Sequence, residues 1–153
     1  MFDFLTPVVI GLHLVSVHLP AEPWQNNVNP GVYVRSASGL TVGAYRNTLS
    51  RPSIYIAQSF ELAPEGLAPL RFALTVGVVS GYRIKRVDQP CPPGTRPDHA
   101  CYTLEGITNA HLLPMLTPSV SMPLGGSNSL RLSFIPSLAS RSSVFHLSAE
   151  HSF

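Results

Sequence analysis

The two cysteines are the side chains whose positions most directly suggest chemistry. Cys91 and Cys101 enclose nine residues that are rich in proline and can neither form a helix nor continue a sheet. A disulfide between them is the natural interpretation and would contribute about 2 to 3 kcal/mol by loop closure, with two free thiols as the alternative. Asp98 and His99 lie in the same loop, but no CxxC or HxxxH spacing accompanies them. We therefore expect no metal site and no cofactor.

Three charged side chains are candidates for ion pairing inside the molecule. Glu61, Arg131 and Glu150 each lie in an alternating segment, on its small or polar face. If that face fills the interior of a barrel, Arg131 can pair with a carboxylate there. Charge is otherwise scarce, at 12% of the residues against about 25% in a typical soluble domain. The net charge of +2 and the single basic cluster at residues 83–86 are too small to indicate a nucleic-acid partner.

Strands must position these side chains, because apolar residues recur with period two and no window holds a sustained helical stripe. We expect strands at residues 8–19, 31–37, 40–47, 53–62, 71–82, 115–122, 129–136 and 142–153. Most connections are short and rich in turn formers, which favours antiparallel hairpins, while one loop excursion covers about residues 88–110. The sequence thus predicts a single all-β domain over residues 1–153, an eight-stranded antiparallel up-and-down β-barrel.

The two faces of the expected strands differ in character. In the fourth, Ile54, Ile56 and Phe60 alternate with small or polar residues such as Ser53 and Ser59. In a transmembrane barrel the bulky face meets lipid and the other face fills the interior. A soluble barrel inverts this arrangement, and the alternation alone leaves both open. The scarcity of charge favours the membrane arrangement, because too few charged residues are present to coat a soluble barrel.

Four prolines lie beside or within the expected strands, at Pro7, Pro30, Pro118 and Pro136. A proline cannot donate a hydrogen bond to a sheet, so prolines on neighbouring strands leave local gaps in the ladder. We expect such gaps to act as lateral openings into the barrel.

Several segments, taken in order and spacing, resemble the PagP family of outer-membrane lipid A palmitoyltransferases, which are eight-stranded barrels with a slot for one acyl chain. The segments that carry the resemblance are Asn29-Pro30-Gly31, Ala44 to Thr48, Phe60-Glu61, Pro114 to Pro118 and Phe134-Ile135-Pro136. The resemblance implies that Pro7 and Pro30 frame one lateral opening and that Pro118 and Pro136 frame the other. It also implies that Ser59 forms the floor of the acyl slot.

The resemblance places the active site of the family, a histidine, an aspartate and a serine, on His13, Asn47 and Thr48. His13 would then be the general base of acyl transfer and Thr48 would donate or orient. Asn47 departs from the family, because an amide cannot stabilise a histidine cation as a carboxylate does. His13 also lies six residues after Pro7, where the family has five, so a bulge is expected. The alternatives are an interior polar histidine and a simple hairpin turn at Asn47 and Thr48.

These observations lead to one functional hypothesis and two alternatives. The lead hypothesis is a non-catalytic PagP-like barrel that is a structural or accessory part of an assembly with other subunits, most naturally in a bacteriophage virion. It rests on the low charge and on an N-terminal region that does not read as an export signal; a virion also meets oxidising conditions that suit a disulfide. The alternatives are an outer-membrane lipid A acyltransferase, which moves a palmitoyl chain from a phospholipid, and a soluble lipid-binding barrel.

Overall fold

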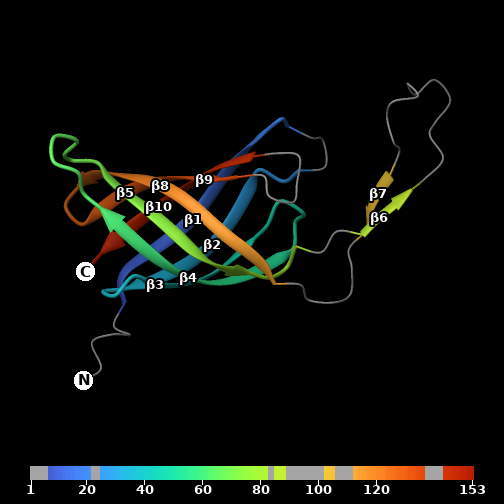
Figure 1. Ribbon diagram of the computed structural model, residues 1–153, viewed down its shortest axis with the longest axis horizontal. Helices are drawn as coiled ribbons and strands as arrows, with labels where there is room; N and C mark the ends of the chain where they lie inside the picture. Colours follow the sequence, from blue (N-terminus) through green and yellow to red (C-terminus); the bar gives the residue numbers. More distant parts are fainter. Residues whose placement is uncertain (1–6, 22–24, 83–84, 89–101, 106–111, 137–142) are drawn as a thin grey trace.

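The computed structural model describes residues 7–21, 25–82, 85–88, 102–105, 112–136 and 143–153. It confirms the predicted fold, since eight antiparallel strands close into a barrel (Figure 1). The barrel strands are β1 (Pro7–Leu19), β2 (Val28–Ser36), β3 (Leu40–Arg46), β4 (Pro52–Leu62), β5 (Arg71–Val79), β8 (Leu113–Gly125), β9 (Asn128–Ile135) and β10 (Ser143–Ser152). Each strand pairs with its neighbours along the chain, and β1 pairs with β10 to close the barrel.

Two short strands, β6 (Lys85–Asp88) and β7 (Tyr102–Glu105), come between β5 and β8 in the chain and form a separate two-stranded sheet. The sequence predicts only a loop excursion here, because strands of four residues carry too little alternation to be recognised. Cys91, Cys101 and the neighbouring Asp98 and His99 lie outside the described residues. The expected disulfide therefore stays a prediction.

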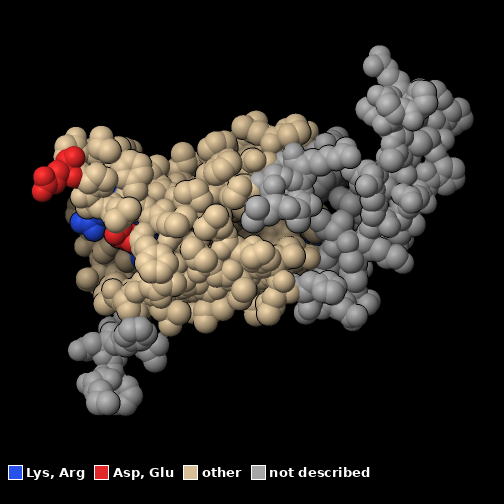
Figure 2. Space-filling view, in the orientation of Figure 1, with Lys and Arg blue, Asp and Glu red and all other residues tan. Residues whose placement is uncertain are grey.

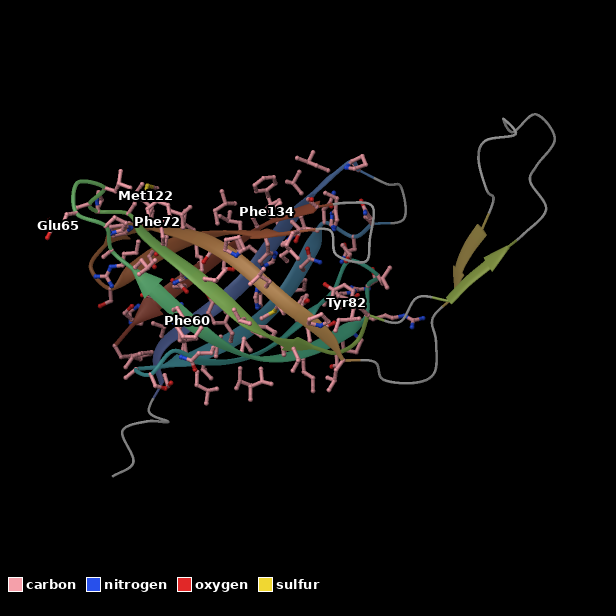
Figure 3. All side chains as sticks on the ribbon, viewed as in Figure 1. Phe60, Glu65, Phe72, Tyr82, Met122 and Phe134 are labelled. Atoms are coloured by element: carbon pink, nitrogen blue, oxygen red, sulfur yellow. The ribbon has the colours of Figure 1, made fainter. Side chains whose placement is uncertain are left out.

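The barrel has two different ends. One, called here the turn end, is made by the short connections at residues 37–39, 63–70 and 126–127. The other, the loop end, is where β1, β3, β5 and β9 end and where β2, β4, β8 and β10 begin. Figure 3 shows Glu65 at the turn end and Tyr82 at the opposite, loop end. β1 and β8 are the longest strands, with 13 residues each.

The bulky apolar face of the strands points outward. Ile54 and Leu62 are 64% and 66% exposed, whereas Ser53, which directly precedes Ile54 in β4, is 1% exposed. The same alternation holds in β2, where Val32 and Val34 are exposed and Tyr33 is buried. In the view of Figure 2 the flank of the barrel shows no charged residue, and the basic and acidic atoms that are visible lie at the turn end. The barrel is thus apolar outside and polar inside, the arrangement typical of transmembrane barrels.

Two tyrosines fill the middle of the interior because glycines on neighbouring strands leave room for their rings. A Cβ at Gly11 would overlap the ring of Tyr33, and a Cβ at Gly43 would overlap the ring of Tyr55. Both tyrosines are buried and form the small apolar core of the barrel together with Ala57 and Val79. Within the part of the chain described, no helix is long and apolar enough to span a membrane.

Candidate functional site

Four charged side chains form a closed network inside the barrel, near the turn end. Arg131 contacts Glu150 at 2.7 Å and Glu61 at 2.8 Å. Arg35 contacts the same two carboxylates, Glu61 at 2.9 Å and Glu150 at 3.3 Å. The hydroxyl of Tyr33 donates a further hydrogen bond of 2.6 Å to Glu150. Because two cations face two anions, the network is neutral as a whole, and burial strengthens the contacts of Glu150 most.

This network contains the three residues that the sequence singles out for the interior, Glu61, Arg131 and Glu150, together with Arg35, which sequence reasoning missed. The signal for Arg35 was present, because it lies two residues after Tyr33 on the face opposite Val32 and Val34. Alternation of period two assigns it to the interior as firmly as it assigns the other three.

An interior cavity of about 660 Å³ extends from this network to the loop end. That volume lies within the usual range for a site that binds a small ligand. Its wall is polar at the loop end, aromatic in the middle and apolar on the side of β8 and β9. The residues that represent these three regions are His18, Asn29 and Thr48; His13, Tyr33, Tyr45 and Tyr55; and Leu113, Met115 and Ile135.

The strands β8 and β9 are only partly paired. Their register begins at Ser119 opposite Ser133 and runs toward the turn end. In the described part of the barrel, residues 113–118 of β8 therefore have no partner on β9, and residues 134–135 of β9 pair only with β10. The sheet is thus open between β8 and β9 over the half that lies toward the loop end.

The prolines of β8 account for this gap. The ladder between β5 and β8 runs without interruption through Pro114 and Pro118, so the positions that lack an N–H face β9 and not β5. Pro136 follows the last residue of β9 and lines the cavity, as do Pro114 and Leu116. Pro114 and Leu116 are also exposed on the outer face, so the cavity reaches the outside of the barrel through the gap.

Pro7 and Pro30 lie differently from this pair. Pro7 is opposite Ser36 at the turn end, whereas Pro30 precedes Gly31, which is opposite His13. The pairing of β1 with β2 continues between these positions, from Pro7 to Val15 with irregularities at both ends. The two prolines therefore do not frame one gap, because Pro30 lies six positions before Ser36, the residue opposite Pro7.

His13 lies at the centre of a chain of hydrogen bonds across the cavity. Its Nδ1 is 2.7 Å from Nε2 of His146, and its Nε2 is 3.0 Å from the hydroxyl of Tyr55. The Nδ1 of His146 is in turn 2.8 Å from Oγ of Ser16. The register of β1 shifts between His13 and Val15 against both neighbouring strands, which is the irregularity expected from the spacing after Pro7. Both ring nitrogens of His13 thus have partners.

Asn47 has a different environment. It is fully buried, and its Nδ2 donates to Oγ of Ser53 at 2.9 Å and to the carbonyl of Gly81 at 3.0 Å. Its Oδ1 accepts from the backbone N–H groups of Leu49 and Arg51. The side chain therefore uses both donors and its acceptor to hold the turn between β3 and β4.

Thr48 lines the cavity at the loop end, next to Tyr82. Burial raises the pKa of the Tyr82 hydroxyl, and its hydrogen bonds with Tyr45 and Thr48 act against that rise. The hydroxyls of Tyr45 and Tyr82 are 2.8 Å apart. Tyr82 was expected in a strand that in fact ends at Val79, so sequence reasoning missed its place in the site.

The structure does not join His13, Asn47 and Thr48 into a hydrogen-bonded triad. Among the described residues, the partners of His13 are His146 and Tyr55, and those of Asn47 belong to its own turn and to the end of β5. Ser59, the expected floor of an acyl slot, is buried and lines the cavity. Its Oγ is 3.0 Å from that of Thr41 and 2.9 Å from that of Thr75, so three hydroxyls meet there.

Comparison with known proteins adds nothing to this geometry. No family model matches the chain, and no curated protein matches its sequence. The resemblance to the PagP family therefore stays a prediction, and the features that bear on function are the cavity, the gap and the outward apolar face.

Replacing Asn47 by aspartate tests whether this residue only holds the turn or belongs to a catalytic triad. We expect Asn47→Asp to lower the free energy of unfolding by about 3 kcal/mol, because a buried carboxylate cannot donate to Ser53 or to the Gly81 carbonyl. Urea unfolding measures the effect, and the exposed Asn128→Asp serves as the control. A stable Asn47→Asp variant with new palmitoyl-transfer activity would instead support the active site implied by the resemblance.

Proposed function

We propose that the protein is a bilayer-spanning β-barrel that holds one acyl chain of a lipid in its interior cavity without transferring it. The observation that carries the proposal is the reversed distribution of side chains, with Leu, Ile, Val and Phe outward and Ser, Thr, Arg and Glu inward. Apolar surface of this extent must be covered by something, and a bilayer covers it on all sides of the barrel.

The strand lengths and the position of the charges support a membrane setting. The barrel strands have 7 to 13 residues, and a tilted strand needs about 9 to 11 residues to cross a bilayer. On the outward face of the described strands, the charged residue is Arg46, the last residue of β3. Arg71, the first residue of β5, has the parity of the inward residues and is exposed at the turn end. The middle of the outward face is uncharged, as the hydrocarbon core of a membrane requires.

The cavity and the gap support an acyl chain as the ligand. A chain dissolved in the bilayer already lies beside the barrel wall, and the opening between β8 and β9 connects that wall with the cavity. The cavity side of the opening is lined by Leu113, Met115 and Ile135, which offer apolar contact to a hydrocarbon. A ligand that enters sideways does not have to leave the apolar phase before it binds.

Binding without transfer is supported by the geometry of the central histidine. A general base needs a free ring nitrogen that faces its nucleophile, and both nitrogens of His13 are held by His146 and Tyr55. Asn47 is engaged within its own turn and does not orient His13. An assay of palmitoyl transfer to lipid A is therefore expected to show no activity.

To test the proposal, lipid vesicles are added to the unfolded chain, and flotation shows whether the protein is bound to the vesicles or stays in solution. Floating with the vesicles, followed by native mass spectrometry that finds one retained acyl lipid per chain, supports the proposal. A chain that stays in solution as a detergent-free assembly overturns it in favour of a virion or other assembly in which protein subunits cover the apolar face. Transfer of the acyl chain overturns it in favour of an acyltransferase.

A single charge on the outward face gives a matched test of the membrane setting. In lipid vesicles, Val32→Arg is expected to lower the free energy of unfolding by about 2 to 4 kcal/mol, because Val32 lies outward in the middle of β2. Ala37→Arg, at an exposed site in the turn after β2, should change it by less than about 0.5 kcal/mol. Equal effects of the two substitutions, measured by urea unfolding, would argue against a bilayer around the barrel.

A further inference from the structure

Two polar side chains at the loop end of the cavity each leave one buried atom without a partner. His18 is 3% exposed and Asn29 is 2% exposed, and both line the cavity from the neighbouring strands β1 and β2. The Nε2 of His18 and the Oδ1 of Asn29 have no hydrogen-bond partner within the described structure. Buried polar atoms are rarely left unpaired in folded proteins, so two on one side of one cavity point to a bound group.

The other contacts of these side chains determine what the unpaired atoms can do. The Nδ2 of Asn29 donates to the carbonyls of Asn26, at 3.4 Å, and Arg46, at 3.0 Å, so the free Oδ1 is an acceptor. The Nδ1 of His18 is 2.7 Å from Oδ1 of Asn27 and must donate to it. A neutral imidazole that donates through Nδ1 carries a lone pair on Nε2. The loop end of the cavity therefore offers two acceptors.

The charges around the cavity narrow the chemistry further. The charged residues that line its described wall are Arg35 and Arg131, and both are paired with Glu61 and Glu150 near the turn end. On the described wall of the loop end, an anionic head group would meet two acceptor lone pairs and no unpaired cation. An ammonium group would find no carboxylate on that described wall to balance its charge, and burial of an unbalanced charge is costly. An uncharged donor is the group that fits.

We propose that the loop end of the cavity binds the uncharged head group of a single-chain lipid with two hydroxyls, one donating to His18 Nε2 and the other to Asn29 Oδ1. The inference rests on the proposed function, because it assumes that the acyl chain of the same ligand occupies the cavity beyond the head group. Thr117 adds a third unpaired polar atom on β8, beside the gap. Its strand partner is Thr75, whose hydroxyl is 2.9 Å from that of Ser59, so Thr117 is not counted in the head-group site.

The test compares three ligands with the same chain and different head groups. Monopalmitoylglycerol offers hydroxyl donors, methyl palmitate offers none, and palmitate at mildly alkaline pH is an anion. Competition between them for the full-length protein in neutral detergent, followed by native mass spectrometry, should favour monopalmitoylglycerol over each of the others by roughly tenfold, since a buried acceptor left unpaired weakens binding.

A variant then assigns the preference to His18. In His18→Asn the amide nitrogen can take the place of Nδ1 and donate to Asn27, while the Nε2 acceptor is removed. We expect monopalmitoylglycerol to bind roughly five- to tenfold more weakly and methyl palmitate to bind as before. His151→Asn is the matched control, because His151 makes the same contact with Asn128 at 2.9 Å on the exposed surface, away from the cavity wall.

The outcomes separate this inference from the function on which it rests. If none of the three ligands binds, the acyl-binding function is wrong, and the head-group inference falls with it. If all three bind equally, or if palmitate binds best, the acyl chain is held but the hydroxyl site is wrong. If His18→Asn weakens the binding of all three ligands equally, His18 has a structural role, and this result would also overturn the inference.

Discussion

Glu150→Gln is expected to lower the free energy of unfolding by about 3 to 5 kcal/mol, because it removes one anion from a buried network and leaves two guanidinium groups short of a partner. Glu150 is 5% exposed, and it accepts hydrogen bonds from Arg131, Tyr33 and Ser129. The neutral amide keeps the shape of the side chain but not the charge. Urea unfolding in the same lipid or detergent as the wild type measures the loss.

Glu61→Gln is the matched control for this prediction. Glu61 contacts the same two arginines at similar distances, yet its side chain is 34% exposed, whereas that of Glu150 is 3% exposed. Water can therefore take over part of its role, and the expected loss is about 1 kcal/mol. Equal losses in the two variants would contradict the view that burial, and not the number of contacts, sets the contribution of each carboxylate.

The barrel could be predicted because its signal is repeated along the whole chain. Each strand alternates bulky and small residues, and a shift of one residue would move every side chain to the wrong face. That Glu61, Arg131 and Glu150 lie on the same face as the small and polar residues followed from that period. Which face points inward did not, because the alternation around Ile54 and Ser53 is the same whether the apolar side meets lipid or fills a core.

The contacts within the site could not be predicted, because they depend on which strands lie opposite one another across the barrel. Residue 13 meets residue 146 through the closure of β1 on β10, which no local pattern reveals. A turn at Asn47 and Thr48 was one of the two alternatives from the sequence, but a sequence cannot show that all the hydrogen bonds of Asn47 are used within its surroundings. The unpaired atoms of His18 and Asn29 became visible only with the cavity.

The prolines predicted two lateral openings, and the structure has a gap at one of the two places. Pro114 and Pro118 have the same parity in β8, so both lack a donor toward the same neighbour, and the gap between β8 and β9 follows. Pro7 and Pro30 were grouped with equal reason, yet they lie at opposite ends of the paired part of β1 and β2. A proline removes one donor, but the surrounding residues decide whether the strands separate.

Closing the gap between β8 and β9 with a disulfide is expected to slow the release of a bound chain by at least about tenfold, because lateral passage requires these strands to stay apart. Continuing the register by one residue beyond Ser119 and Ser133 brings Pro118 opposite Phe134. The double variant Pro118→Cys/Phe134→Cys places the bridge there, in a background in which Cys91 and Cys101 are replaced by serine. The release of a pyrene-labelled single-chain lipid, followed by fluorescence, gives the rate in oxidised and reduced protein.

The control bridge lies two residues away, where the strands are already paired. Val120 is opposite Leu132 in the β8–β9 register, so Val120→Cys/Leu132→Cys joins the same two strands without changing the gap. Its oxidation should leave release unchanged, while reduction of the Pro118→Cys/Phe134→Cys bridge should restore the original rate. Slowing by both bridges would show that general stiffening of the barrel limits release. Slowing by neither would mean that the chain leaves through the loop end, since the cavity reaches His18 and Thr48 there.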